Sequence, residues 1–299
     1  MTSISHSDII TSTVKKLSDP ESFKNLSHQH REGEPMPSSE ELNDFINLAR
    51  AILFPGFFGN STINSRTLNY HIGVKVERMY ELLVEQILAG MCYECAAKDV
   101  THFNEYQEKA MDKAASFIEK LPELRRILGT DVLAAYNGDP AAQSTGEVIF
   151  CYPAIRAITN YRLAHELLLL DVPLIPRMIT EMAHSETGID IHPGATIGEF
   201  FTIDHGTGVV IGATAIIGKN VKLYQGVTLG AKSFPLDEEG NPIKGIPRHP
   251  IIEDDVVIYS NATILGRITV GQGATIGGNI WVTEDVAPGA RIIQSKAKK

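Results

Sequence analysis

Aliphatic residues return at every sixth position in the last third of the chain. An interval of six matches neither the 3.6-residue turn of an α-helix nor the alternation of an ordinary strand. It is typical of a coil of short strands joined by turns, in which each repeat directs one aliphatic side chain toward the axis. We therefore predict a left-handed, triangular parallel β-helix. The positions with this interval are Ile191, Ile197, Ile203, Val209, Ala215, Val221 and Val227, then Ile252, Ile258, Ile264, Val270, Ile276 and Val282.

One polar segment interrupts this repeat. Residues 231–247 are rich in Pro and Gly and too irregular for coil strands, so we expect them to loop out of the stack. Loops extruded from a rigid scaffold often carry function, which makes this insertion informative. The coil is expected to resume near Pro250 and to end at Pro288-Gly289.

Apolar residues before Gly188 follow helical spacing instead. Ser38 supplies an N-cap, Pro122 is expected to begin a new helix, and Asn137-Gly138-Asp139-Pro140 is a strong turn signal. We predict an α+β chain with an N-terminal all-helical domain, residues 1–188, and a β-helix domain, residues 189–299. The expected helices cover residues 38–53, 70–91, 101–121, 122–128, 131–136, 153–170 and 175–184.

Composition narrows the possible functions. The 299 residues carry a formal net charge of −9, which argues against general nucleic-acid affinity. No apolar run approaches the ~20 residues of a membrane span, and residues 1–19 lack the apolar stretch of a signal peptide. Cys92, Cys95 and Cys151 are an odd number of cysteines, so we expect reduced thiols and a cytoplasmic protein.

Three polar clusters break the repeat, beginning at Asp190, Asp204 and Arg248. Ionisable groups in a coil cost desolvation energy unless they lie at an edge or are paired. Asp190 and His205 are 15 residues apart, and one coil takes roughly 18 residues, so we expect these two residues about one layer apart. The carboxylate would then hold one imidazole nitrogen and leave the other free as a base.

The spacing leaves other interpretations open. The histidines could be turn residues with locally satisfied hydrogen bonds. His192, His205 and His249 could also hold zinc across a subunit interface, as three histidines do in some β-helix proteins. Each of these histidines lies beside a charged residue or Pro, however, and we expect no metal.

The order of the motifs resembles a known family. The clusters read Asp-Ile-His-Pro, Asp-His-Gly-Thr-Gly and Arg-His-Pro, and Gln225-Gly-Val-Thr-Leu-Gly230 lies between the last two. Asp139-Pro-Ala141, Tyr161-Arg162 and Ala164-His-Glu-Leu167 precede them. From about residue 137 to 287, this succession resembles the serine O-acetyltransferases, which are hexapeptide-repeat acyltransferases. The resemblance implies transfer of acetyl from acetyl-CoA to the L-serine hydroxyl, giving O-acetylserine for cysteine biosynthesis.

The resemblance also implies roles for the polar residues. His205 matches the general base that takes the proton from the serine hydroxyl, and Asp190 matches its orienting carboxylate. The alkoxide would attack the thioester directly, through a tetrahedral oxyanion that needs backbone donors.

Four further residues match those that bind the amino acid. Asp139 and Asp204 match carboxylates that hold the substrate ammonium, so the site would be shared between the helical and β-helix domains. Arg248 matches the group that binds the substrate carboxylate, for which a planar guanidinium is well suited. His249 matches a residue that supports substrate binding nearby.

The acyl donor implied by the resemblance is acetyl-CoA as a co-substrate, with no permanently bound cofactor. Gly230 and Ala231 match the backbone that faces the thioester oxygen. Ser260 and Gly278 match small residues along the path of the pantetheine arm.

The resemblance implies a homotrimer or a dimer of trimers, with the CoA groove between adjacent subunits. Feedback inhibition by cysteine would follow if cysteine competed for the serine-binding residues. The loop before Arg248 is longer than in the best-known members. The isoleucine-ending tail that docks into cysteine synthase is absent before Lys299, so we expect no such complex.

Two other classes of function stay open. Another hexapeptide acyltransferase would act on a different amino acid or a sugar, and would not need Asp139 together with Arg248. A non-enzymatic β-helix scaffold would tolerate changes at Asp190, His205 and Arg248, and CoA would not raise its melting temperature.

Overall fold

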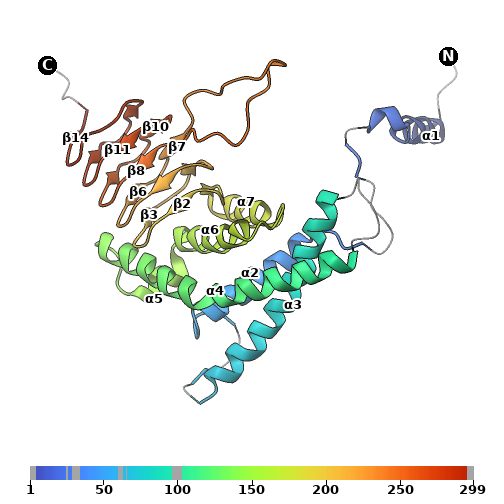
Figure 1. Ribbon diagram of the computed structural model, residues 1–299, viewed down its shortest axis with the longest axis horizontal. Helices are drawn as coiled ribbons and strands as arrows, with labels where there is room; N and C mark the ends of the chain where they lie inside the picture. The colour runs from blue at the N-terminus through green and yellow to red at the C-terminus, as the bar shows by residue number, and fades with distance from the viewer. Residues whose placement is uncertain are drawn as a thin grey trace.

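Helices and strands occupy separate parts of the chain (Figure 1). The computed structural model describes residues 5–24, 26–28, 34–59, 63–64, 66–95 and 103–294. All the helices come first, and the last of them ends at Gly188, whose left-handed backbone (φ 71°) turns the chain into the first strand. The helices are α1 (His6–Leu17), the 3₁₀ turn η1 (Pro20–Ser22), α2 (Ser39–Leu53), α3 (Leu68–Cys95), α4 (Phe103–Gly138), α5 (Thr145–Cys151), α6 (Pro153–Leu169) and α7 (Ile175–Thr187).

The predicted helices over residues 101–121, 122–128 and 131–136 are one continuous helix, α4, so the break expected at Pro122 is wrong. Proline in a helix interior removes a backbone hydrogen bond, but packing can outweigh that cost. Phe117, Leu121, Leu124 and Leu128 are all buried on one face that runs past the proline. The sequence prediction also missed α1 and α5.

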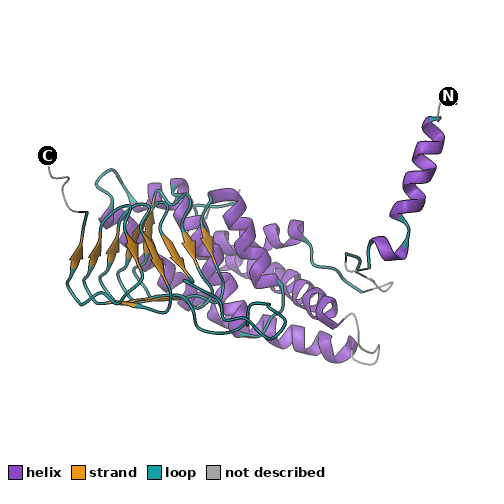
Figure 2. Cartoon of the chain, turned by 90° about the horizontal axis from the view of Figure 1, so that it is seen from above, coloured by secondary structure: helices purple, strands orange, loops and turns teal. Residues whose placement is uncertain are grey.

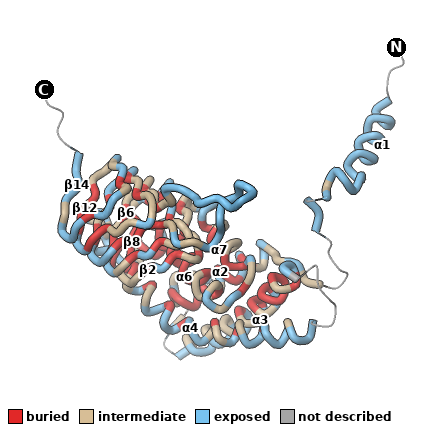
Figure 3. The backbone as a smooth tube through the Cα atoms, turned by 45° about the horizontal axis from the view of Figure 1, so that its top comes forward, coloured by how far each residue is buried: buried red, intermediate tan, exposed pale blue. Residues whose placement is uncertain are grey.

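Helix α6 lies at the centre of the molecule. It packs against α4, α7 and the first strands of the β-helix. Its first four turns are almost entirely buried, as expected for a helix covered on several sides (Figure 3). This helix therefore fixes the position of the β-helix relative to the other helices.

The predicted β-helix is confirmed: short parallel strands form three faces of a stacked coil (Figure 2). The first face holds β1 (Asp190–Ile191), β4 (Val210–Ile211), β7 (Thr228–Gly230), β10 (Thr263–Leu265) and β13 (Trp281–Val282). The second holds β2 (Thr196–Ile197), β5 (Ile216–Ile217), β8 (Ile251–Ile252) and β11 (Thr269–Val270). The third holds β3 (Thr202–Asp204), β6 (Lys222–Tyr224), β9 (Val257–Ile258), β12 (Thr275–Ile276) and β14 (Arg291–Ile292).

The coil ends later than predicted. Strand β14 follows Pro288-Gly289 and pairs with β12, so these two residues form a turn and not the end of the coil. Gly289 takes a left-handed backbone (φ 68°), and its N–H donates to the Gln272 carbonyl 2.8 Å away. Glycine adopts this conformation without a steric penalty.

The coils are unequal in length. Asp190 pairs with Val210, which is 20 residues later, whereas Val210 pairs with Thr228, which is 18 residues later. The two extra residues lie in the turn that joins Asp204 to Val210. Because of them, the single six-residue register predicted from Ile191 to Val227 is wrong. In the second coil the buried strand residues are Ile211, Ile217 and Leu223, two positions beyond the predicted ones.

The predicted loop is confirmed as the second irregularity. Thr228 pairs with Thr263, 35 residues later, because residues 231–250 leave the stack between β7 and β8. The projecting segment contains a small hairpin, in which Leu236 pairs with Pro242 in an antiparallel bridge. It is largely exposed and extends away from the coil (Figure 3).

Helix α6 caps the open end of the coil. Along the stack, N–H groups donate to the carbonyls of the next coil, which leaves carbonyls of the first coil without a strand partner. Tyr161 donates its hydroxyl to Ala195 (2.7 Å), and His165 donates Nδ1–H to Pro193 (2.7 Å). Arg162 donates to the carbonyls of Ile197 and Gly198 (3.2 and 2.7 Å), and also pairs with the buried Asp131 of α4.

Some predictions remain untested. The division into domains at residue 188 coincides with the change from helices to strands, but whether each part is a separate unit stays a prediction. Among the described residues, no helix is long and apolar enough to cross a membrane. Cys92 is buried and Cys151 is exposed. The side chain of Cys95 and residues 295–299 lie outside the described part.

Candidate active site

Four of the predicted site residues, Asp204, His205, Arg248 and His249, lie at two corners that border the first face of the coil. We call residues 204–209, between the third and first faces, the His205 corner. We call residues 192–195 and 212–215, between the first and second faces, together with the loop 231–250, the Arg248 corner. Each corner contains one of the two irregularities of the coil.

His205 projects from its corner into solvent. Its backbone is left-handed (φ 60°), a strained conformation for a residue with a side chain, and its side chain is 72% exposed. Its Nε2 lies 3.8 Å from Oδ1 of Asp204. The two extra residues of the first coil therefore lift an imidazole out of a regular stack and place it beside a carboxylate.

Asp139 reaches the His205 corner from the end of α4. Its carboxylate accepts hydrogen bonds from the Tyr152 hydroxyl and from the Ala141 N–H (2.8 Å). These two hydrogen bonds, the Tyr152 bond foremost, lower the pKa of Asp139, and the nearby Lys222 and His205 act in the same direction. The same bond to Asp139 raises the pKa of Tyr152 to about 12. Asp139 is thus an ionised carboxylate near His205, and its predicted role in holding the substrate ammonium stays a prediction.

Two residues of this corner were missed by the sequence analysis. Tyr152 precedes α6 and carries no motif of its own. Lys222 lies in β6, and its Nζ is 3.2 Å from Asp204 and 2.7 Å from the Gly138 carbonyl. A lysine in a coil strand, where aliphatic and small residues are the rule, was the available signal.

His249 is the most buried polar residue of the Arg248 corner, with 7% of its surface exposed. Burial, with the charge of Arg248 next in importance, lowers its pKa to about 4, so the imidazole is neutral at neutral pH. Its Nδ1 accepts from the Thr214 N–H (3.1 Å), which leaves the proton on Nε2. Gly212 makes room for the ring, because a Cβ there would lie 2.0 Å from His249 Cδ2.

Arg248 has no carboxylate partner among the described residues. Its backbone N–H is anchored to the Thr214 hydroxyl (2.9 Å), and its guanidinium lies 5.8 Å from the centre of the Phe234 ring in the loop. Its Nε is buried and makes no hydrogen bond within the described chain. A guanidinium held in place and lacking an anion can receive a carboxylate.

Asp190 faces a different neighbour from the one predicted. Its Oδ1 lies 4.0 Å from Arg177 Nη1 in α7, and no hydrogen bond or ion pair joins it to His205 in the described part of the chain. The predicted spacing assumed a regular coil, and the first coil is longer. Catalytic hydrogen bonds are often long before substrate binds, so the role of Asp190 stays a prediction.

Asp190 also belongs to a small group of possible metal ligands. Its carboxylate, Glu181 and His184 have ligand atoms within 4.8 Å of one another. Arg177 lies against both carboxylates and supplies a positive charge there. This group differs from the three histidines considered from the sequence.

The residues expected to bind CoA are divided between the corners. Ser260 follows strand β9 and Gly278 follows strand β12, so both lie along the same edge of the third face as His205. A Cβ on Gly278 would lie 3.0 Å from the Ser260 carbonyl oxygen. Gly230 and Ala231 lie at the base of the loop, at the Arg248 corner. Their assignment to CoA stays a prediction.

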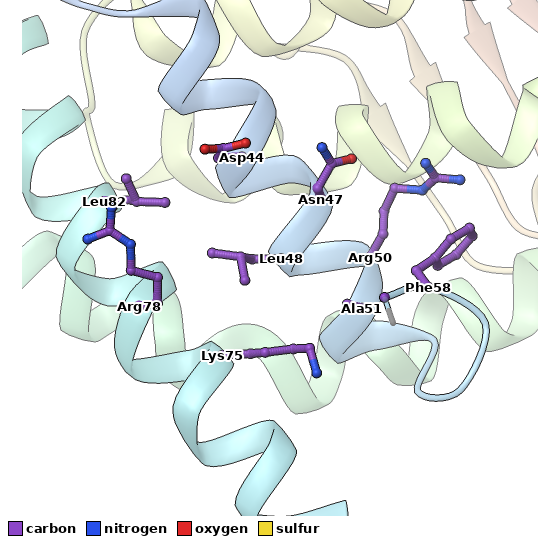
Figure 4. Close-up of a pocket in the computed structure, with 10 residues that line it drawn as sticks. Asp44, Asn47, Leu48, Arg50, Ala51, Phe58, Lys75, Arg78 and Leu82 are labelled. Atoms are coloured by element: carbon purple, nitrogen blue, oxygen red, sulfur yellow. The ribbon is translucent and has the colours of Figure 1, made fainter. Parts of the chain in front are cut away.

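A cavity of about 500 Å³ lies elsewhere, between α2 and α3 (Figure 4). Leu48 and Arg50 line it from α2, Lys75 and Arg78 from α3, and Phe58 from the connection between the helices. Arg50 lies over the Phe58 ring, 4.0 Å from its centre. None of the predicted site residues lines this cavity.

Comparison with known proteins shows the family to which the chain belongs. No family model matches the chain. A curated relative, the plasmid serine acetyltransferase of Synechococcus elongatus, is 49% identical over 294 residues, covering 97% of this chain and 91% of that protein. The chain belongs to the serine acetyltransferase family.

Other members support this assignment. The serine acetyltransferase of Bacillus subtilis is 43% identical over 181 residues, covering 58% of this chain and 79% of that protein. The solved structure of isoform 3 from Entamoeba histolytica, in complex with cysteine, is similar with a TM-score of 0.72 and 33% identity, covering 98% and 94% of the two chains. The soybean enzyme with serine has a TM-score of 0.54 at 27% identity, covering 88% and 99%. The family inferred from the motifs is therefore confirmed.

Proposed function

We propose that this protein is an acetyl-CoA-dependent serine O-acetyltransferase that makes O-acetylserine for cysteine biosynthesis. The observation that carries the proposal is the separation of charge between the corners. Carboxylates gather beside an exposed imidazole at one, and at the other lies a guanidinium with no carboxylate partner among the described residues. A zwitterion with a hydroxyl group needs these three elements.

The residues act as follows in this proposal. Asp139 and Asp204 receive the serine ammonium, and Arg248 receives the carboxylate, with the neutral His249 as a nearby donor through Nε2. His205 takes the hydroxyl proton while the oxygen attacks the thioester carbon. The tetrahedral intermediate then expels the CoA thiolate, which takes the proton back from the imidazolium. Acetyl-CoA is a co-substrate here, and no resident cofactor or metal takes part.

An acyl-acceptor screen tests the reaction. Purified protein is mixed with acetyl-CoA and, in turn, serine, homoserine and a set of sugars, and free thiol is measured. We expect thiol release with serine and O-acetylserine as its product. Release with a sugar or homoserine but not with serine would favour the rival acyltransferase. No release with any acceptor, together with no rise in melting temperature on adding CoA, would favour the scaffold.

We also propose a trimer whose sites lie between subunits. Within one chain the corners lie at opposite edges of the first face, whereas a neighbouring coil packed against it would bring the Arg248 corner of one subunit to the His205 corner of the next. Apolar side chains are exposed on the coil, for example Trp281, which is 69% exposed. Such exposure is expected of a face that packs against another subunit. The pairing of two such trimers stays a prediction.

Mixing inactive variants tests the shared site. His205→Ala and Arg248→Ala are co-expressed with different affinity tags and isolated as mixed assemblies. If each site uses both corners from different subunits, the isolated mixed trimers regain about a third of wild-type activity, because one of the three sites in every mixed trimer receives both intact residues. Activity no higher than that of the single variants would place both corners of each site on one chain.

Cysteine is expected to inhibit at the same residues. Its ammonium and carboxylate match those of serine, so it would occupy the two corners. Inhibition that is competitive with serine is the expected result, and inhibition independent of serine concentration would contradict it. A cytoplasmic location, and the absence of a complex with cysteine synthase, stay predictions.

A further inference from the structure

We infer that Lys222 is a positioning residue that holds the helical part and the coil together at the serine-binding carboxylates. The inference rests on the proposed function. Lys222 joins the end of α4 to the third face of the coil, at the point where Asp139 and Asp204 come together.

The contacts of Lys222 define a bridge. Its Nζ donates to the Gly138 carbonyl at 2.7 Å, the last residue of α4, and lies 3.2 Å from Oδ2 of Asp204. Its ammonium also lies 4.6 Å from the centre of the Tyr224 ring. Since Asp139 follows Gly138 directly, the bridge ends beside that carboxylate.

This ion pair differs from a surface pair. The side chains of Lys222 and Asp204 are 17% and 18% exposed. Burial acts to lower the pKa of Lys222, but its contacts with Tyr224 and Asp204 outweigh that effect and the pKa is raised. Pairs between exposed groups contribute little, whereas charge-assisted hydrogen bonds shielded from water contribute more.

Charge explains what the bridge does. Asp139 and Asp204 belong to different parts of the fold, and two carboxylates facing one site repel each other. Lys222 offsets one of the two negative charges, which leaves a net charge of −1 to meet one substrate ammonium. Without Lys222, the ammonium of serine would have to bring the two carboxylates together itself.

Substrate binding would then be weakened more than the chemical step. Part of the free energy of serine binding would be used to bring the two carboxylates together, so serine would bind less tightly. Once serine is bound, the reacting groups are in place again and the chemical step is little changed. Lys222→Met should therefore raise the KM for serine about tenfold or more, the range lost with one charge-assisted hydrogen bond. The kcat and the KM for acetyl-CoA should change less than about twofold.

Two further variants make the comparison specific. Lys222→Arg keeps the charge and the donors, and should restore most of the serine KM. Lys219→Met is the matched control, because Lys219 lies three positions earlier and pairs with Glu199 on the surface, with 65% of its side chain exposed. It should leave both KM values at the wild-type level.

The experiment measures kcat and both KM values for wild type, the three variants and Lys222→Gln, with thermal melting as the check on folding. If Lys222→Met melts early, Lys222→Gln, which keeps a donor without the charge, replaces it. A raised serine KM with rescue by arginine supports the inference. A folded neutral variant with an unchanged or lowered serine KM, or with both KM values raised equally, overturns it. Wild-type protein that does not acetylate serine would instead overturn the proposed function.

Discussion

The two corners of the coil differ in what their insertions achieve. At the His205 corner, two added residues push one imidazole into solvent, beside the carboxylate of Asp204 and the end of α4. At the Arg248 corner, a loop of the chain leaves the stack and returns with Arg248 and a buried, neutral His249. One corner collects negative charge, and the other presents a cation.

The regular part of the coil carries no such chemistry. Aliphatic side chains fill its axis, while strand residues that point away from the axis, such as Val210, Ile216 and Trp281, are exposed. An ionisable group inside this repeat would be desolvated without a partner. His205, Arg248 and His249 accordingly lie where the repeat is broken, whereas the charged strand residues Asp190 and Lys222 lie beside ionic partners. The comparison of the two corners can be tested by disabling each in turn.

The largest effect is expected at the His205 corner. His205→Ala removes the proposed base, and general base catalysis is typically worth ~10²–10⁴-fold in rate. We expect kcat to fall by that range in a steady-state thiol-release assay. The melting temperature should not change, because the side chain is 72% exposed.

His6→Ala is a suitable control, since His6 is exposed at the start of α1 and far along the chain from either corner. Wild-type turnover in His205→Ala would remove the proposed mechanism. Loss of turnover together with early melting would show a structural role for the residue instead.

The next largest effect is expected at the Arg248 corner. Arg248→Lys keeps the positive charge but loses the planar fork that pairs with a carboxylate through two hydrogen bonds. We expect the serine KM to rise by roughly 10-fold to 100-fold, the cost of one or two charge-assisted hydrogen bonds. The KM for acetyl-CoA is measured in parallel, and an equal rise in both would argue against a carboxylate-specific role.

Gly212 tests how the Arg248 corner is built. A Cβ at this position would overlap the His249 ring, so Gly212→Ala should displace the imidazole and destabilise the fold by about 1–3 kcal/mol. Gly129→Ala is the matched control, because Gly129 lies in α4 and a Cβ added there would meet nothing within 4 Å. That change should stabilise the protein by roughly 0.5–1 kcal/mol, and denaturant unfolding measures both. Equal effects of the two changes would contradict this account of the corner.

The last prediction concerns the pH dependence of stability. His249 has a pKa of about 4 in the folded protein and 6.5 ordinarily, so the unfolded chain binds a proton first as the pH falls. The stability that the neutral ring provides is complete above pH 6.5 and is lost as the pH falls toward 4. We expect the free energy of unfolding to decrease on the order of 2 kcal/mol more over this window in wild type than in His249→Gln. The same pH dependence of the free energy of unfolding in wild type and in His249→Gln would contradict the burial of a neutral ring.

Much of the fold was predictable from periodicity. Thirteen of the strands in the described residues were expected from the aliphatic interval, because every repeat must fill the same narrow axis, while β14 lies beyond the predicted end of the coil. The loop was predictable because a long run rich in Pro, Gly and charged residues does not fit the short strands of the coil. Helix α4 was not predictable at Pro122, since the packing of its buried face outweighs the signal of a single proline.

The site was predictable only in part. The residues at each corner could be named because ionisable groups are out of place in a coil. The distances between these residues could not be inferred. The two residues added after Asp204 shift the repeat by two positions, but aliphatic or small residues such as Val209 and Ala215 occupy the unshifted positions too, so the sequence does not show the shift. Tyr152 and Lys222 act through contacts between distant segments, which no local pattern records.

The most direct test of the central claim is a crystal structure of the protein with bound serine. The account predicts that the serine carboxylate is paired with Arg248, that its ammonium lies between Asp139 and Asp204, and that its hydroxyl is within hydrogen-bonding distance of His205. Serine bound away from either corner, or with its hydroxyl turned away from the imidazole, would contradict the account.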